Sequence, residues 1–260
     1  SIEQLREVLK VVKETVVPLT LLGNGSNVLV RDKGIRGIVI KLGNMLRHFY
    51  EAEDLLVFGS GYSLALASYK AMECGKTGME FAVGIPGSIG GAVYMNAGAY
   101  DGEMQNIVNC VKVMDLQGNE RVLTAEELNF GYRKTSLQNS GLIVTEVTLK
   151  MPSGNKDEIK SKMDDFSHRR ISKQPLEMPS AGSMFKRPPG YFAGTLIDQA
   201  GLKGYTVGGA QISTKHAGFV VNVGGATAAD VLQLIKDVQT KIKAGVGVEL
   251  QPEVLVIGEE

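Results

Sequence analysis

The residues best suited to chemistry lie in one glycine-rich stretch, Val83 to Tyr100, which contains five glycines, three alanines and almost no charge. Each glycine inside a regular element costs roughly 0.5–1 kcal/mol relative to alanine. We therefore expect backbone that approaches a ligand closely or adopts positive φ, rather than a helix or a strand. Peptide N–H groups left out of a ladder form a concave surface that binds anions. Composition alone leaves open an ordinary glycine-rich loop at a tight helix–sheet contact.

A second glycine motif, Gly23 to Asn27, lies between the predicted strands 19–22 and 28–30. It resembles the start of a dinucleotide fingerprint, but Val28 occupies the third glycine position and a strand follows where that motif needs a helix. Gly75-Lys76-Thr77 resembles the end of a loop that binds nucleoside triphosphates. That loop requires a glycine five positions before Gly75, and Lys70 occupies this position. Neither classical motif is present, although a turn rich in Gly, Asn and Ser can still offer N–H groups to a phosphate.

Taken one at a time, the candidate residues for acid–base chemistry have little support from their local sequence. Ser183 lies in an Ala-Gly-Ser turn, Arg133 follows Gly-Tyr, and Glu253 precedes a strand. Each has an ordinary alternative: a turn cap, a surface cation and a solvated edge charge. The three histidines, His48, His168 and His216, lack metal-ligand spacing, so we expect no metal site. No nucleophile-elbow motif supports a catalytic triad.

The pattern of apolar residues predicts an α+β protein that must position these groups. Predicted helices cover residues 2–13, 63–74, 155–170, 193–200 and 227–243, the last ending at Gly245, and the capping box Thr124-x-x-Glu127 predicts a further short helix. Predicted strands cover residues 19–22, 28–30, 35–40, 55–58, 107–116, 120–123, 142–151, 205–207, 219–223 and 254–257. A proline-marked boundary at 174–189 separates a glycine-rich ligand-binding part from a smaller α+β part, and the final strand returns to the first part.

Composition excludes several classes of protein. The chain has 260 residues, and its 28 basic and 28 acidic residues cancel, so no global field attracts nucleic acid or an anionic membrane. The 32 glycines are well above the usual share of about 7%, but they do not repeat as in collagen. The two cysteines form no CxxC pair, and we find neither a signal peptide nor an apolar run of membrane-spanning length. We expect a cytoplasmic protein with reduced thiols.

Eight motifs in order resemble those of the UDP-N-acetylenolpyruvoylglucosamine reductases, type II branch, over essentially the whole chain. They are Leu-Gly-Asn-Gly-Ser-Asn-Val-Leu at 22–29, Gly-Ile-Pro-Gly-Ser-Ile-Gly-Gly-Ala at 84–92, Asn-Ala-Gly-Ala-Tyr at 96–100, Phe-Gly-Tyr-Arg at 130–133, Ala-Gly-Ser-Met-Phe-Lys at 181–186, Gly-Leu-Lys-Gly at 201–204, Lys-His-Ala-Gly-Phe at 215–219 and Pro-Glu-Val at 252–254. Each of these motifs alone has low specificity, but a chance match of all eight in the same order is implausible.

The resemblance implies a fold like that of the vanillyl-alcohol oxidases, with FAD-binding subdomains and a smaller α+β substrate-binding domain. The implied boundaries are 1–42 for the first subdomain, 43–178 completed by 248–260 for the second, and 179–247 for the substrate-binding domain. Family members usually carry a further N-terminal segment with a strand and a flavin contact. Since this chain opens on the helix at Ile2, we expect part of the first subdomain to be missing.

The resemblance also implies FAD and NADPH as cofactors and a role for each motif. The implied catalytic residues are Arg133 and Glu253, which would stabilise an enolate, and Ser183, which would donate a proton. The implied cofactor-binding residues are Asn24, Gly25, Ser26, Asn27, Gly84, Ile85, Pro86, Gly87, Ser88, Gly91, Asn96, Gly98, Ala99, Tyr132 and Ile143. The implied substrate-binding residues are Lys173, Arg187, Lys203 and His216; many family members have asparagine where Arg187 stands.

The implied activity is reduction of the enolpyruvyl ether of UDP-N-acetylglucosamine enolpyruvate in peptidoglycan precursor synthesis. We expect small-molecule substrates, no nucleic-acid or membrane partner, and a monomer. Two alternatives are another FAD-dependent oxidoreductase of the same fold and a flavin-free module that binds sugar nucleotides. An alcohol or sugar-acid oxidase has no need of a serine proton donor, and a yellow colour would separate the module from either enzyme.

Overall fold

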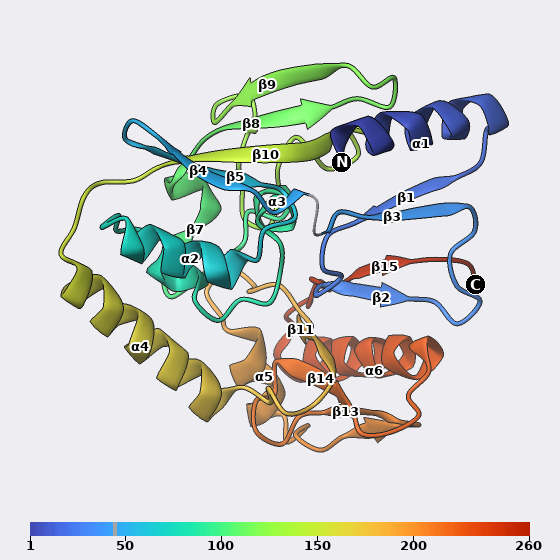
Figure 1. Cartoon of the computed structure of the whole chain (residues 1–260). Helices are drawn as coiled ribbons and strands as arrows, with labels where there is room; N and C mark the ends of the chain where they lie inside the picture. Colours follow the sequence, from blue (N-terminus) through green and yellow to red (C-terminus); the bar gives the residue numbers. More distant parts are fainter. Residues whose placement is uncertain (44–45) are drawn as a thin grey trace. The chain divides into compact units, whose positions relative to one another are not determined.

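A computed structural model describes residues 1–43 and 46–260, and these form two compact units. The first unit comprises residues 1–25 and 37–168, and the second comprises residues 26–36 and 169–260. Both units mix helices and sheets, as the sequence pattern predicts (Figure 1). In the described ranges, no helix is both long enough and apolar enough to cross a membrane.

The first unit is built on a five-stranded antiparallel sheet in the order β4-β5-β10-β8-β9. These strands are β4 (Phe49–Ala52), β5 (Leu55–Gly59), β8 (Val108–Met114), β9 (Glu120–Thr124) and β10 (Ile143–Lys150). Helices α2 (Leu64–Glu73) and α3 (Ile89–Tyr94) and the short helix η2 (Glu80–Ala82) add their apolar side chains to the core of this sheet. The sheet therefore fixes α3, which lies inside the glycine-rich stretch.

A smaller cluster holds α1 (Ile2–Thr15) against the parallel pair of β1 (Leu19–Leu22) and β3 (Ile38–Lys41). Leu5 and Leu9 of α1 are buried there with Met114 and Ile143. The helix begins with a capping box, in which the Ser1 hydroxyl accepts from the N–H of Gln4 and the Gln4 side chain returns to the N-cap backbone. The remaining short elements of this unit are β6 (Gly98–Ala99), β7 (Gly102–Glu103) and η3 (Met104–Asn106).

The second unit contains a four-stranded antiparallel sheet in the order β11-β14-β13-β12. Its elements are β11 (Ser180–Ser183), α5 (Ala193–Gln199), β12 (Thr206–Val207), β13 (Ala210–Ile212), β14 (Phe219–Asn222) and α6 (Ala228–Val246). Leu234, Ile235, Val238 and Ile242 of α6 form one side of its core. Helix α4 (Lys156–Lys173) begins in the first unit and ends in the second.

The C-terminal strand β15 (Leu255–Ile257) pairs in parallel with β2 (Val28–Val30), so the chain end does return to an early strand. Asp32, just after β2, accepts hydrogen bonds from the first N–H groups of α6, at Ala228 (2.7 Å) and Ala229 (3.0 Å). These contacts explain why residues 26–36 belong to the second unit. Because β15 pairs with a strand of residues 1–42, it does not extend the five-stranded sheet; the functional domain boundaries themselves remain predictions.

Most predicted elements are confirmed, and several differ from the prediction. The glycine-rich stretch does contain a helix, α3, against the prediction of neither helix nor strand. Thr124 and Glu127 form both bonds of a capping box, but the following residues make turns rather than a helix, and Asn129 takes a φ of 43°. The sequence pattern does not predict strands β4, β11 and β13 or the pair β6–β7. Helix α6 passes Gly245 and ends at Val246, followed by the left-handed C-cap Gly247, which has a φ of 72°.

Candidate active site

In the first unit, Gly23, the first residue of the shorter glycine motif, lies against the glycine-rich stretch. A Cβ on Gly23 would lie 2.7 Å from the Ser88 hydroxyl and 3.8 Å from the Cα of Gly91. Ser88 is the N-cap of α3, and its hydroxyl accepts from the N–H of Gly91 at 3.3 Å. The turn after β1 therefore packs on the first turn of α3 at a distance that only glycine permits.

Helix α3 is itself seated by close backbone contact. The N–H of Gly90 donates to the Ser60 carbonyl at 2.9 Å, and a Cβ on Gly90 would lie 2.7 Å from the Ser60 Cβ. The N–H of Ile89 donates to the Tyr62 carbonyl. Both Ser60 and Ser88 are buried. The glycine-rich stretch therefore does form a tight helix–sheet contact, which was the alternative to a ligand-binding loop. The solvent-exposed turn after β1 lies beside this contact.

That open turn has the donor set of a phosphate cradle. Across residues 1–43 and 46–260, no described group accepts a hydrogen bond from the N–H groups of residues 23–27. Gly25 takes a φ of 72°, and no heavy atom lies within 4 Å of the position that a Cβ would occupy there. Asn24 is exposed. Unpaired N–H groups around a left-handed glycine fit the pyrophosphate of a dinucleotide. The residues present therefore fit the FAD that the sequence motifs imply.

Arg133 is joined to the end of the glycine-rich stretch. Its Nη1 donates to the Asn96 carbonyl at 3.3 Å and its Nη2 to the Gly98 carbonyl at 3.0 Å. The guanidinium lies over the Tyr132 ring, 5.0 Å from its centroid. Arg133 takes a φ of 55° in a tight turn that residues 131 and 134 close with reciprocal backbone hydrogen bonds. A cation in a strained turn beside predicted cofactor-binding backbone is typical of a functional site.

Asn96 and Ile143 have side chains that are occupied inside the unit. Asn96 is buried, with its amide nitrogen donating to Glu103 and to the Gly131 carbonyl and its oxygen accepting from the N–H of Gln105. Ile143 is only 2% exposed in the cluster with α1. Any contact of these two residues with a cofactor would therefore come from their backbone.

The other predicted cofactor residues of this unit divide by exposure. Tyr132 and Pro86 are exposed, whereas Ile85 packs partly buried on the main core. Gly98 and Ala99 form the short strand β6, and a Cβ on Gly98 would lie 2.6 Å from the Gly102 carbonyl. Gly84 is half-buried, next to the η2 turn. The backbone of this stretch is thus compact, as expected for a surface that a planar ligand would contact.

In the second unit, the structure brings Ser183 and Glu253 to a common neighbour. Ser183, at the end of β11, pairs with Phe219, and the next residue, Met184, donates its N–H to the Gly218 carbonyl at 2.8 Å. The Met184 carbonyl accepts from the N–H of Glu253, also at 2.8 Å. Ser183 is exposed and Glu253 is half-buried. Sheet pairing therefore places these two predicted catalytic residues on adjacent backbone.

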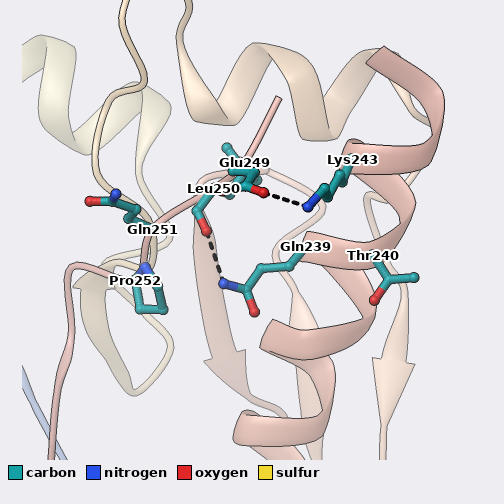
Figure 2. Close-up of a pocket in the computed structure, with 7 residues that line it drawn as sticks. All are labelled: Gln239, Thr240, Lys243, Glu249, Leu250, Gln251 and Pro252. Carbon is teal, nitrogen blue, oxygen red and sulfur yellow. Dashed lines mark hydrogen bonds and ion pairs between the residues drawn. The ribbon is translucent and has the colours of Figure 1, made fainter. Parts of the chain in front are cut away.

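Glu253 follows an irregular segment after α6 whose residues Glu249, Leu250, Gln251 and Pro252 are labelled in Figure 2. Gln239 of α6 donates to the Leu250 carbonyl at 2.9 Å, and Lys243 pairs with Glu249. The N–H of Lys186 donates to the Gln251 carbonyl at 2.8 Å. A pocket of about 350 Å³ lies over this segment, lined by Gln239, Thr240, Lys243, Glu249, Leu250, Gln251 and Pro252. These contacts fix the path of the chain into Glu253, and no motif in the sequence indicates them.

Three predicted substrate-binding residues share one electrostatic environment in the second unit. His216 is half-buried, and burial is the main cause that lowers its pKa; its own backbone hydrogen bond raises the pKa, while the positive charges of Lys203 and Lys173 lower it and Asp198 raises it. The N–H of Gly218 donates to the His216 Nδ1 at 3.1 Å, so the neutral ring carries its proton on Nε2. The site therefore combines two lysine cations with a neutral imidazole donor.

Lys203 and Arg187 have partners that the sequence motifs do not indicate. Lys203 pairs with Asp198 of α5 at 2.7 Å, an acid that belongs to no motif. Arg187 lies over the ring of Phe192, 3.9 Å from the centroid, and the exposed Phe192 also lies outside the motifs. Only the presence of an aromatic residue after Pro-Pro-Gly-Tyr could have indicated it. The ion pair balances the charge of Lys203, and the ring of Phe192 stacks on the guanidinium of Arg187.

The predicted catalytic residues are divided between the units. Arg133 belongs to the first unit, with the glycine-rich stretch Val83–Tyr100 and with Gly23–Gly25, whereas Ser183 and Glu253 belong to the second, with Ser26 and Asn27. Among the described residues, no cluster of three or more His, Cys, Asp or Glu side chains could hold a metal ion.

A family model and curated relatives both relate this chain to the same group of reductases. Residues 1–124 match the family model described as FAD binding domain, and residues 174–257 match that described as UDP-N-acetylenolpyruvoylglucosamine reductase, C-terminal domain. The chain is 52% identical to the UDP-N-acetylenolpyruvoylglucosamine reductase of Clostridium perfringens strain 13 over 258 residues, which cover 99% of this chain and 84% of the relative. It is 49% identical to the enzyme of the same description from Clostridioides difficile, again over 99% of this chain and 85% of the relative.

A solved structure is also similar. The chain matches the UDP-N-acetylenolpyruvylglucosamine reductase of Thermus caldophilus with a TM-score of 0.84 and 39% identity, over 98% of this chain and 89% of that one. Together with the match to the FAD binding domain, this confirms the predicted FAD-binding α+β fold.

Proposed function

The chain belongs to the UDP-N-acetylenolpyruvoylglucosamine reductases, and we propose that it uses NADPH and FAD to reduce UDP-N-acetylglucosamine enolpyruvate to UDP-N-acetylmuramate. The product is a precursor of peptidoglycan, and its synthesis serves cell-wall growth, cell shape and division. The observation that supports this assignment best is the hydrogen bond from the N–H of Glu253 to the carbonyl of Met184, the residue that directly follows Ser183. It places the backbone of the two residues close together, and the reaction needs a proton donor and an oxyanion partner near each other.

FAD, when bound, supplies hydride to the terminal vinyl carbon of the substrate. The N–H groups of residues 23–27 would hold its pyrophosphate, and the backbone of Gly84–Gly91 and of Asn96–Ala99 would line the ring system. Gly23 supports this role because it keeps the cradle tight against Ser88.

Arg133 would stabilise the negative charge that develops toward the substrate carboxylate as the vinyl carbon is reduced. Its cationic fork donors are held in place by the carbonyls of Asn96 and Gly98. A fixed cation needs no reorganisation during the reaction, which makes it more effective than a mobile one. Glu253 would share the stabilisation of the enolate by hydrogen bonding.

Ser183 would donate the proton to the carbon that bears the carboxylate. A serine hydroxyl is a weak acid in water, so the transfer requires a desolvated site with a strong local field. Ser183 is exposed in the protein alone. We therefore propose that the bound substrate itself covers the hydroxyl and excludes water from it.

Lys203, Lys173 and His216 would bind the diphosphate and carboxylate end of the sugar nucleotide. The two lysines influence His216 electrostatically, and the proton on the His216 Nε2 is available to donate. Arg187, stacked on Phe192, would contact the uridine end, where a planar guanidinium and an aromatic ring suit a base. The functional boundaries that we propose are those given by the motifs: 1–42, 43–178 with 248–260, and 179–247.

We propose that the enzyme acts in the cytoplasm as a monomer; its two cysteines, Cys74 and Cys110, are unpaired, as a reducing compartment requires. The test of function is product formation in heavy water. Purified protein, loaded with FAD and given NADPH and the enolpyruvyl sugar nucleotide, should release a product carrying two added hydrogens. The hydrogen on the carbon that bears the carboxylate should be deuterium, delivered by the exchanged serine hydroxyl. Release of unchanged substrate, or oxidation of an alcohol in its place, would refute the proposal.

A further inference from the structure

The peptide of Glu253 is held from both sides although it lies in an irregular segment. Its N–H donates to the Met184 carbonyl at 2.8 Å, and its carbonyl accepts from the side-chain Nδ2 of Asn27 at 3.1 Å. A carboxylate on irregular backbone keeps its direction only if neighbouring groups fix that backbone. The hydrogen bond from Asn27 reaches Glu253 from the predicted phosphate-binding turn.

Asn27 is tied to this segment by its backbone as well. The Asn27 carbonyl accepts from the N–H of Leu255 at 3.0 Å, and the parallel pairing of β2 with β15 begins at the next residue, where Val28 aligns with Leu255. The side chain is half-buried, and a backbone carbonyl can accept only from the amide nitrogen, which fixes the orientation of the amide. The side chain of Asn27 is thus aimed at Glu253, and the N–H groups of the same turn are left for a phosphate.

We infer that Asn27 is a positioning residue for Glu253, which joins the turn that binds the cofactor phosphate to the acid that stabilises the enolate. This inference rests on the proposed function and changes the role of Asn27, which the motif alone assigns to cofactor binding. Order in the turn when FAD is bound is transmitted to the Glu253 peptide through one amide. Small misplacements of a catalytic group of this kind are costly, of order 10²-fold for about 1 Å.

The decisive experiment is a double-mutant cycle on the FAD-loaded enzyme with Asn27→Ala, Glu253→Gln and the pair. Flavin reduction by NADPH and reoxidation by the enolpyruvyl substrate are followed separately by stopped flow. We expect Asn27→Ala to leave reduction within about 2-fold and to slow reoxidation by roughly 10-fold, with little change in substrate KM. In the Glu253→Gln background, removal of Asn27 should have no further effect.

A matched control removes an asparagine from the end of strand β14 in the same unit. The side-chain oxygen of Asn222 accepts from the N–H groups of Gly224 and Ala226, so Asn222→Ala should lower thermal stability without slowing either half-reaction. Asn27→Asp keeps the shape of the side chain but not the donated hydrogen bond, and it replaces Asn27→Ala if that variant does not fold. We expect it to shift the pH profile of reoxidation, which a purely structural residue would leave in place.

The possible outcomes distinguish the positioning role of Asn27 from the catalytic role of Glu253. Multiplicative effects of Asn27 and Glu253, or equal damage to both half-reactions together with weaker FAD binding, would overturn the positioning role and favour direct binding of phosphate by the side chain. Normal reoxidation in Glu253→Gln would instead refute the catalytic role of Glu253 in the proposed function.

Discussion

The contact between Gly23 and Ser88 makes a prediction whose magnitude can be worked out from distances. A methyl group on Gly23 would lie 2.7 Å from the Ser88 hydroxyl, too close for both to remain. The hydroxyl can rotate away, but it then no longer caps α3 through the N–H of Gly91. Loss of an N-cap costs about 1 kcal/mol, within a range of roughly 0.5–2 kcal/mol. We expect Gly23→Ala to destabilise the first unit by about that amount.

A second substitution, Ser88→Ala, removes the hydroxyl that the methyl group at position 23 would contact. Ser88→Ala should also cost about 1 kcal/mol because it deletes the same cap. In the double variant the methyl group of Gly23→Ala meets no hydroxyl, so its cost should be about that of Ser88→Ala alone rather than the roughly 2 kcal/mol that two independent losses would give. The assay is chemical unfolding of the three variants and wild type with bound FAD, followed by circular dichroism, with FAD affinity measured from flavin fluorescence.

The control is Gly25→Ala, which meets no neighbour but forces alanine to a φ of 72°. Its cost of about 1–2 kcal/mol comes from backbone strain, and Ser88→Ala should not relieve it. Additive costs of Gly23→Ala and Ser88→Ala would contradict the clash argument. Relief of Gly25→Ala by Ser88→Ala would contradict it equally.

Three further predictions concern the second unit. Ser183→Ala should slow flavin reoxidation by the enolpyruvyl substrate by about 10²–10⁴-fold and spare reduction by NADPH, and stopped-flow traces with equal loss in both steps would exclude a proton donor. Lys203→Ala should raise the KM for the sugar nucleotide by about 10-fold, or roughly 1.4 kcal/mol, at nearly constant kcat in steady-state assays; a fall in kcat alone would contradict diphosphate binding. Burial lowers the pKa of His216, so the unfolded chain binds more protons than the folded one below the ordinary histidine pKa of about 6.5. Stability should therefore fall as the pH drops below that value, and His216→Gln should show a shallower fall in urea titrations at several pH values; identical slopes would refute the assignment.

Local patterns predict the regular elements well because their causes are local. Helix α1 and strands β8 and β9 follow from apolar spacing and a turn signal, and the structure confirms them. Helix α3 is not predictable in this way, because propensity disfavours its glycines, whereas contact with Ser60 requires one of them. That contact comes from tertiary packing, which no window along the chain contains.

The candidate site, too, has features that the local sequence predicts and features that only tertiary contacts determine. The motifs indicate the turn at 23–27 and the residues Ser183 and Glu253, but not that Met184 joins the two latter residues. Sheet pairing between distant segments decides such contacts. The role of Asn27 toward Glu253 and the tautomer of His216 are likewise set by single hydrogen bonds to distant or turn backbone. Residue types indicate what chemistry is available, and only the register determines which groups meet.

The most direct test of the central claim is the visible absorption spectrum of the FAD-loaded protein under anaerobic conditions. NADPH is added first, and the enolpyruvyl sugar nucleotide second. We expect NADPH to bleach the flavin absorption and the sugar nucleotide to restore it, with UDP-N-acetylmuramate as product. Failure of the sugar nucleotide to restore the absorption, with rapid recovery in oxygen instead, would contradict it.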